Sequence, residues 1–250
     1  MNIAQQLYEG VDIKGRGTVG LITYLRTDST RVADEAKVAS KDYISENYGE
    51  KYLPQNSNAK KDDKKIQDAH EAIRPTDLSL SPALVKESLQ RDQFRLYQLI
   101  WKRFVASQMA PAQYETTSVR IGAGEYIFTV SASKIVFDGF MSVYKTDDDN
   151  EETNALAKGL DENSVLTLDD VNGTQHFTQP PAHFTEASLV KALEEQGIGR
   201  PSTYAPTITT IIARRYVTRE KKNLYVTELG EAVNNVMKTE FSVIVDTQFT

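Results

Sequence analysis

The hydrophobic period of this 250-residue chain changes twice, and the change limits the folds open to it. Before about residue 110 the apolar residues recur at helical spacing, and one predicted helix carries a clear stripe: Phe94, Tyr97, Trp101, Phe104 and Val105. Between about 115 and 172 apolar and polar residues alternate, which is typical of half-buried strands. After Pro180-Pro181 helical spacing returns. We therefore predict an α+β, multidomain protein with helical ends and a β-rich middle.

Start and stop signals place the helices of the first block. The chain opens in a helix that ends at Gly10, and another is expected over about 31–48 with Gly49 as its stop. A glycine-containing loop and the apolar run 19–22 lie between them. Ser81-Pro82 predicts the start of a further helix, and the aromatic stripe belongs to a helix over about 92–107.

The other two blocks have their own element order. The middle block predicts a hairpin around 122–124, then strands within 133–144 and 164–173 with an acidic loop between them. The last block predicts a helix over 186–196, a second helix up to 215, a short hairpin within 216–227 and a helix from 228. Helix, helix, two-stranded wing and helix is the order of a winged-helix-like unit.

Negative charge is concentrated in one part of the chain. The formal net charge is -6, but residues 138–170 hold ten acidic side chains against two lysines, so the remainder is +2 (-6 minus -8). Residues 180–225 carry a local +3, from seven basic and four acidic side chains. This distribution permits binding to phosphate groups without demanding it.

Cysteine and long apolar runs are both missing from the sequence. Without cysteine the chain can form neither disulfides nor a thiolate metal site, which fits the reducing cytoplasm. No apolar run approaches the ~20 residues that a membrane-spanning helix needs, and the start has no signal-peptide pattern. These features predict a cytoplasmic protein that does not bind membranes.

Tyr24 and Arg26 follow the apolar run 19–22 and are two positions apart, so on an extended segment their side chains share one face. A phenol needs cations or a base to become a nucleophile, and an arginine can hold a phosphate through two hydrogen bonds. The pair therefore fits attack on a phosphate ester. Ordinary exposed strands carry the same residues, however, and Asp28, Ser29 or Thr30 could simply cap the next helix.

His70 lies in a second polar segment, DAHEAIRPT. The side chain could contact phosphate or transfer a proton, or the segment could be a plain surface turn. It is not a zinc pattern, because no second spaced histidine or cysteine accompanies it. The three aspartates at 147–149 lie in a polar stretch and predict a solvated loop rather than a metal site.

A third segment, QGIGRPSTYAPT, combines features of an anion site. Gly199 would let the backbone approach a ligand closely, and Ser202 or Thr203 would cap the next helix, whose N-terminus can bind an anion. Arg200 adds charge, and Tyr204 adds a face on which a base can stack. A plain connection between two helices explains the segment equally well.

Taken together, three segments resemble the type IA DNA topoisomerases, in particular bacterial topoisomerase I: GLITYLRTDST, QDAHEAIRPT and EASLVKALEEQGIGRPSTYAPTITTIIARRYV. The stretches RLYQLIWKRFVASQMAPA and QHFTQPPAHFTEASLV are similar to that family as well, so the likeness extends essentially from end to end.

The resemblance implies that Tyr24 attacks a DNA phosphodiester, forming a 5′-phosphotyrosyl link and a free 3′-hydroxyl. Another strand passes through the gap and the hydroxyl reseals it without ATP, which relaxes negatively supercoiled DNA. Arg26 matches the arginine that holds the scissile phosphate, His70 a histidine close by, and Thr27 and Asp28 are expected to contact DNA. The turn expected to line the single-strand groove comprises Gly199, Arg200, Ser202, Thr203 and Tyr204.

Compared with the family, the chain lacks the acidic metal-binding domain. We therefore expect part of the toroidal core of a longer, monomeric, nucleoid-associated enzyme, with Mg²⁺ as a cofactor whose ligands lie outside this chain. The expected parts are a helical nucleophile domain at about 1–110, part of a β-rich hinge or gate domain at 111–178 and part of a helical single-strand DNA groove domain at 179–250. Alone, the chain should relax DNA little or not at all.

Two alternatives stay open at this stage. The parent could be a type IA relative specialised for decatenation or fused to a helicase. Alternatively, the chain could be a non-catalytic module that binds single-stranded DNA through its winged-helix-like end. For that module Tyr24→Phe should change no activity, whereas a nucleophile requires the loss of the covalent adduct.

Overall fold

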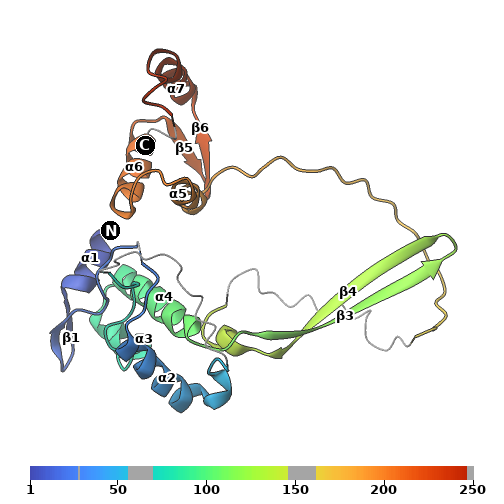
Figure 1. Cartoon of the computed structure of the whole chain (residues 1–250), viewed down its shortest axis with the longest axis horizontal. Coiled ribbons are helices and arrows are strands. Elements are labelled where there is room, and N and C mark those ends of the chain that lie inside the picture. The colour runs from blue at the N-terminus through green and yellow to red at the C-terminus, as the bar shows by residue number, and fades with distance from the viewer. Residues whose placement is uncertain (28, 56–69, 146–161, 247–250) are drawn as a thin grey trace. The chain divides into compact units, whose positions relative to one another are not determined.

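The computed structural model describes residues 1–27, 29–55, 70–145 and 162–246. The chain divides into two compact units, Met1–Asp170 and Val171–Thr250 (Figure 1). Helices and antiparallel strands occur in both units, so the predicted α+β class is confirmed. The finer division of the first unit into a nucleophile domain and a hinge domain stays a prediction, and the acidic run 147–152 lies outside the described residues.

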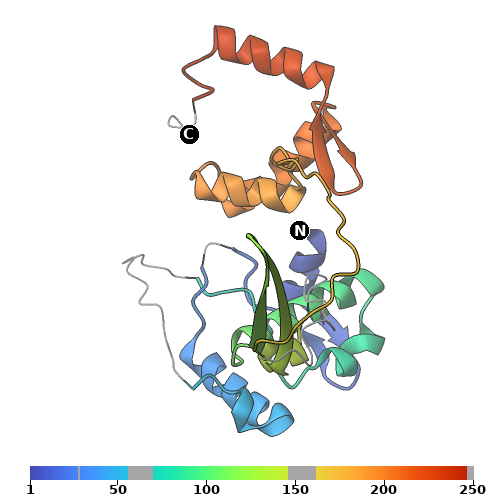
Figure 2. The same cartoon turned by 90° about the vertical axis from the view of Figure 1, so that its right-hand side faces the viewer.

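Helices predominate before residue 110. The elements are α1 (Asn2–Glu9), β1 (Val11–Ile13), β2 (Gly17–Val19), α2 (Asp34–Tyr48), η1 (Glu50–Tyr52), α3 (Pro82–Val85), η2 (Lys86–Ser88) and α4 (Arg91–Ser107). Gly10 and Gly49 follow α1 and α2 with φ of 131° and 97°, and Pro82 opens α3 after Ser81, as predicted. Although α1 and α4 are far apart in the sequence, they pack against each other (Figure 2).

The aromatic stripe of α4 forms the centre of the first unit's core. Four of its five members are buried, and Phe94 is half-buried. Other elements contribute buried side chains to the same cluster: Leu7 from α1, Leu21 and Ile22 from the apolar run, Ile44 from α2 and Val85 from α3. Each such side chain contributes roughly 1.5–3 kcal/mol by leaving water. The apolar run that precedes Tyr24 is thereby fixed to the core.

Alkaline pH should destabilise the first unit through Tyr97. Its hydroxyl donates to the Leu80 carbonyl (2.6 Å), and burial, with a smaller contribution from Asp77, raises its pKa. The folded state therefore holds this proton more tightly than the unfolded state does. The contribution of Tyr97 to the free energy of unfolding is constant at neutral pH and falls once the pH exceeds about 10. We expect a loss of about 1.4 kcal/mol per pH unit from this group, measured by urea unfolding between pH 8 and 11.

The matched variant for that measurement is Tyr97→Phe. It should be less stable at neutral pH by about 1–3 kcal/mol, because the Leu80 carbonyl loses its donor, but its stability should depend less on alkaline pH. Burial raises the pKa of Tyr43 and Tyr48 as well, so a shallower slope of the same sign should remain. Equal slopes in the two proteins would contradict the prediction.

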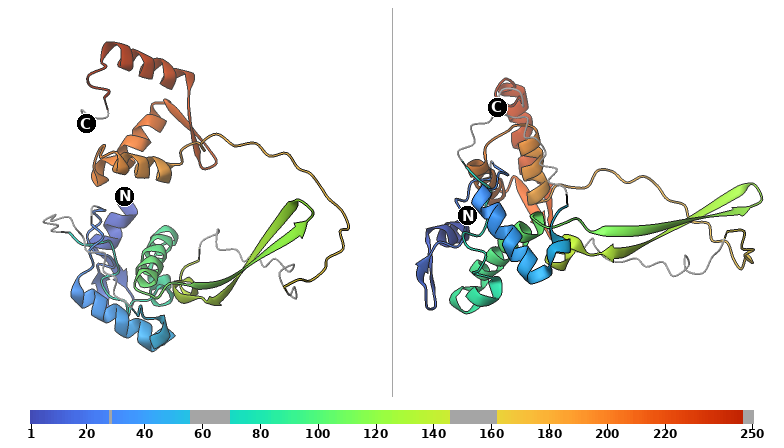
Figure 3. Two further views of the ribbon diagram at one scale, coloured as in Figure 1. Left: turned by 45° about the vertical axis from the view of Figure 1, so that its right-hand side comes forward. Right: turned by 60° about the horizontal axis from the view of Figure 1, so that its bottom comes forward.

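The predicted hairpin is a long two-stranded ribbon formed by β3 (Gln113–Ala123) and β4 (Tyr126–Phe137) (Figure 3). Gly124 begins its turn with φ of 61°. Alternation gives the ribbon a hydroxyl-bearing face and an apolar face. The cross-strand pairs include Thr116–Ser133 and Ser118–Ser131 on the first face, and Val119–Val130 and Ile121–Phe128 on the second. Most of these side chains are exposed or half-buried, so the ribbon lacks a packed cover within the described residues.

The expected strands after the hairpin are only partly correct. The strand predicted within 133–144 ends at Phe137, because η3 (Gly139–Ser142) turns the chain. Gly139 has φ of 48°, and a Cβ there would lie 2.5 Å from the Ala110 carbonyl oxygen. The strand predicted within 164–173 is wrong, since this segment has no regular structure and leaves Val165 98% exposed. Alternation alone does not make a strand when no neighbouring strand satisfies its backbone groups.

The second unit has the predicted order of helix, helix, two-stranded wing and helix. Its elements are α5 (Glu186–Glu195), α6 (Pro201–Ala213), β5 (Val217–Glu220), β6 (Asn223–Val226) and α7 (Glu228–Glu240). Thr185 and Thr227 cap α5 and α7, because each side chain accepts a hydrogen bond from a first-turn N–H. Throughout the described part of the chain, the helices are too short or too polar to cross a membrane.

Candidate active site around Tyr24

Two of the predicted motif segments, 20–30 and 67–76, meet in the first unit. Ile22 and Pro75 form an antiparallel bridge between them. The hydrogen bonds that join the segments include Thr23 N–H to the Arg74 carbonyl (2.9 Å), Thr76 N–H to the Leu21 carbonyl (3.1 Å) and the Thr23 hydroxyl to the Ala72 carbonyl (2.9 Å). This pairing brings together residues that are about fifty positions apart, and Thr23, its last paired residue in the run 20–23, directly precedes Tyr24.

Tyr24 lies where the buried run meets solvent. Leu21 and Ile22 are buried in the core, whereas Tyr24 is 50% exposed. The His70 ring stacks against the Tyr24 ring, with centroids 5.7 Å apart and an interplanar angle of 29°. On the Tyr24 ring there is also an edge-to-face contact with Tyr8 of α1, at 5.4 Å. The structure therefore brings Tyr24 and His70 together, and it adds Tyr8, which the sequence patterns did not indicate.

Glu71 and Arg74 hold the His70 segment in place. Glu71 accepts two hydrogen bonds from the Arg74 guanidinium, at 2.9 and 3.0 Å, and both side chains are largely shielded from solvent. The same carboxylate accepts a bond from the Ala33 N–H (3.3 Å), and the Ala72 N–H donates to the Arg31 carbonyl (2.7 Å). The Arg74 charge is therefore used within the fold, which assigns this side chain a structural role.

The other members of the first motif extend from Tyr24 along the chain. Arg26 and Thr27 are exposed and Leu25 is half-buried, whereas Asp28 lies outside the described residues. The capping interpretation of this segment is wrong: α2 begins at Asp34 with Ala33 as its N-cap residue. Ser29 instead accepts a bond from the Arg31 N–H (3.2 Å) and is 8% exposed. Because these residues do not cap a helix, capping no longer accounts for the polar cluster.

The third motif forms a tight turn in the second unit. Gly197 and Gly199 have φ of 71° and 76° and lie between α5 and α6. A Cβ at Gly199 would lie 3.1 Å from the Thr203 hydroxyl and 3.2 Å from the Tyr204 ring, so both side chains pack against this glycine. Tyr204 is half-buried, while Arg200, Ser202 and Thr203 are exposed.

The N-cap residue of α6 differs from the ones that were predicted. The helix begins at Pro201 with Arg200 as its N-cap residue, so Ser202 and Thr203 lie within its first turn and neither is the cap. The Thr203 hydroxyl instead accepts from the Arg200 N–H and donates to the Arg200 carbonyl, both at 2.9 Å. Proline is favoured at this first position because its missing N–H would be unpaired there in any case.

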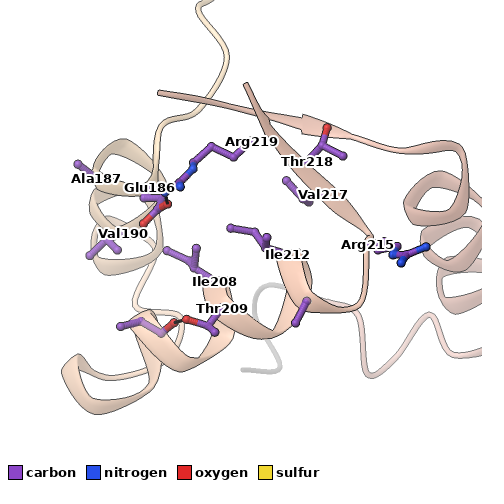
Figure 4. A pocket seen from close by; sticks show the side chains of 12 residues that line it. Glu186, Ala187, Val190, Ile208, Thr209, Ile212, Arg215, Val217, Thr218 and Arg219 are labelled. Carbon is purple, nitrogen blue, oxygen red and sulfur yellow. Dashed lines mark hydrogen bonds and ion pairs between the residues drawn. The ribbon is translucent and has the colours of Figure 1, made fainter. Parts of the chain in front are cut away.

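A mainly apolar pocket of about 930 Å³ also lies in the second unit, between α5, α6 and β5. Ile208 and Ile212 of α6 and Val217 of β5 face the space between these elements, whereas Arg215 points away (Figure 4). The Glu186–Arg219 ion pair (2.8 Å) lies at its rim. The pocket lining contains neither a histidine nor a tyrosine, so its chemistry differs from that around Tyr24.

The described residues do not fit a metal site, because they contain no group of three or more His, Cys, Asp or Glu side chains placed to hold an ion. Carboxylate oxygens are the ligands that Mg²⁺ prefers. What the described residues provide instead is an exposed phenol, an imidazole stacked on it and an exposed arginine two positions away. These are groups that attack on a phosphate ester would use: a nucleophile and a cation for the charge that develops on the phosphate.

Comparison with known proteins shows the family of the chain. The family model described as DNA topoisomerase matches residues 1–250. The chain is also similar to full-length topoisomerase I from Thermotoga maritima, with 38% identity and a TM-score of 0.78, over 100% of this chain and 40% of that chain. The chain therefore belongs to the type IA DNA topoisomerase family, which acts on DNA and uses Mg²⁺. It spans two-fifths of the length of that relative.

Proposed function

We propose that this chain is the nucleophile-bearing part of an ATP-independent type IA topoisomerase. The observation that carries the proposal is the position of Tyr24: half exposed, at the junction of two paired motif segments, with His70 stacked on its ring. A nucleophile must be accessible to a phosphate while its backbone is held still, and this arrangement meets both needs.

In the proposed reaction, the Tyr24 Oη forms a bond to a backbone phosphorus of one DNA strand and the bond from phosphorus to the 3′-oxygen breaks. The phenol loses its proton and the departing 3′-oxygen gains one, so the products are a 5′-phosphotyrosyl link and a free 3′-hydroxyl. Arg26 is exposed two positions from Tyr24, and we assign it to the phosphate oxygens on which negative charge builds up. Reversal of the same steps reseals the strand after another strand has passed.

His70 is proposed to contact the DNA phosphate beside Tyr24. The stacked geometry sets the imidazole against the face of the phenol ring, so His70 lies beside the residue proposed to bond to the DNA phosphorus. The Glu71–Arg74 pair would keep the imidazole in that position by holding its segment against the start of α2. Thr27 and Asp28 are proposed to add contacts to the same strand.

The turn at residues 197–204 is proposed to bind single-stranded DNA. Its exposed Arg200 offers positive charge to a phosphate, and the half-buried Tyr204 offers a partial ring surface to a base. The proposed binding partner is the single-stranded region of negatively supercoiled DNA. The protein would meet it in the nucleoid of the cytoplasm. Mg²⁺ would act in the complete enzyme through ligands outside this chain, so we expect little or no relaxation by this chain alone.

An adduct assay tests the proposal. The chain is incubated with Mg²⁺ and a single-stranded oligonucleotide labelled at its 3′ end, with or without the family's metal-binding domain as a separate polypeptide, and then denatured in SDS. We expect a labelled protein band only when the domain is added, because the 5′-phosphate fragment stays on the enzyme. With a 5′ label the protein band should be unlabelled, since that fragment leaves with the free 3′-hydroxyl.

Two results would contradict the proposal. A protein band that retains the 5′ label would mean that the link has the opposite polarity. Detectable DNA binding with no adduct under either condition, while the added domain restores adduct formation to an equivalent piece of the Thermotoga maritima enzyme, would favour the non-catalytic single-strand-binding module.

A further inference from the structure

The Tyr24 ring is contacted on two sides, and one of these contacts lies outside the three motifs. His70 stacks on it from the 67–76 segment, whereas Tyr8 meets it edge to face from α1, with centroids 5.4 Å apart and an interplanar angle of 66°. Tyr8 is 39% exposed, so burying its ring is not what fixes it in place. Its contact with Tyr24 therefore needs an explanation other than core packing.

The backbone of Tyr8 is fixed to the segment that carries Tyr24. The Leu21 N–H donates to the Leu7 carbonyl (2.8 Å), and Leu7 is fully buried in the core. Gly20 allows the two segments to approach closely, because a Cβ at this position would lie 2.7 Å from the Tyr8 carbonyl oxygen. The end of α1 and the start of the motif segment thus form one rigid junction, which sets where the Tyr8 ring can lie.

A half-exposed tyrosine without such neighbours can exchange among several χ1 rotamers. Rings on two sides restrict that exchange, since edge-to-face and stacked pairs favour one arrangement of the ring between them. For a nucleophile this matters directly, because the reacting oxygen must be held close to its target for a large fraction of the time.

We infer that Tyr8 is a positioning residue for Tyr24: the edge-to-face contact of its ring holds the phenol in the orientation that attacks DNA. The inference rests on the proposed function of Tyr24. It assigns the role to the Tyr8 ring, so phenylalanine should replace it fully and alanine should not.

The first test uses this chain with ring-¹³C-labelled tyrosine, and Tyr24→Phe assigns the Tyr24 resonance. In Tyr8→Ala we expect the Tyr24 ring signal to move and its nuclear Overhauser contacts with His70 to weaken. Tyr8→Phe should leave both unchanged. The matched control is Tyr126→Ala, which removes a tyrosine that is 74% exposed in β4 and should not affect Tyr24. Identical Tyr24 signals and contacts in Tyr8→Ala and the unsubstituted chain would overturn the inference.

The second test measures the rate of adduct formation at saturating DNA with the metal-binding domain added. Tyr8→Ala should slow it by roughly three- to tenfold, the effect of one aromatic pair, with unchanged DNA affinity and with full rescue in Tyr8→Phe. A general loss of folding would change affinity as well, so the split between rate and affinity separates positioning from stability.

The outcomes distinguish the two proposals. An unchanged rate in Tyr8→Ala, with no adduct in Tyr24→Phe, would overturn the role of Tyr8 and leave the proposed function intact. A failure of the unsubstituted chain to form any adduct, in an assay where an equivalent piece of the Thermotoga maritima enzyme does so, would overturn the proposed function and this inference with it.

Discussion

Replacing Tyr24 with phenylalanine is expected to abolish the covalent adduct, with a loss of at least about 10⁴-fold, because the substitution removes the atom that bonds to phosphorus. The ring would remain, so its contacts with Tyr8 and His70 should persist. Since Tyr24 is 50% exposed, the free energy of unfolding should change by less than about 0.5 kcal/mol. Affinity for single-stranded DNA should also be retained.

The measurement is the SDS-resistant adduct with 3′-labelled DNA, alongside a binding titration and a urea unfolding curve for each protein. Tyr126→Phe removes the hydroxyl of another exposed tyrosine and is the matched control, which should form the adduct normally. An adduct formed by Tyr24→Phe would refute the assignment. Peptide mapping would then locate the true nucleophile, and Tyr8 would be examined first because its ring is 5.4 Å from that of Tyr24.

Substituting alanine for Gly230 is expected to destabilise the second unit by at least about 3 kcal/mol, the upper range for an overpacked site. The Cβ would lie 2.1 Å from the carbonyl oxygen of Tyr216 and 2.9 Å from its carbon, both backbone atoms. Neither the backbone at Gly230 nor the backbone at Tyr216 can move away easily. Thr227, the N-cap residue of α7, donates its N–H to the Tyr216 carbonyl (3.1 Å) and its hydroxyl to the Arg215 carbonyl (2.7 Å).

Amide hydrogen exchange resolves this effect by unit. Protection should fall in β5, β6 and α7 of Gly230→Ala, while α4 in the first unit keeps its protection. Because the turn at 197–204 belongs to the second unit, affinity for single-stranded DNA should fall in parallel. Gly173→Ala is the matched control, since a Cβ there meets nothing within 4 Å. Unchanged exchange in Gly230→Ala would contradict the prediction, because it would mean that α7 can move away from the β5–β6 hairpin with no loss of stability.

Local signals predicted most of the elements. Gly10 and Gly49 mark helix ends, and the alternation on either side of Gly124 produced the hairpin where it was expected. These features depend on the conformational freedom of single residues and on the period of side chains along one element. The strand expected within 164–173 failed for a different reason. A strand also needs a hydrogen-bonding partner, and that partner is not a property of the segment itself.

In the candidate site too, some features follow from the local sequence and others depend on the tertiary structure. The sequence by itself indicated the residues that we propose for the chemistry, through the Tyr24-Arg26 spacing and the motifs that indicated the family. Only the tertiary structure decided that His70 stacks on Tyr24, that Arg74 is paired with Glu71 and that the Tyr8 ring contacts the Tyr24 ring edge to face. These contacts join positions far apart in the chain, and they arise from the pairing of 20–23 with 72–76 and the packing of α1. The spacing of residues along the chain does not predict which segments pair. That pairing depends on the burial and hydrogen bonding of the whole unit.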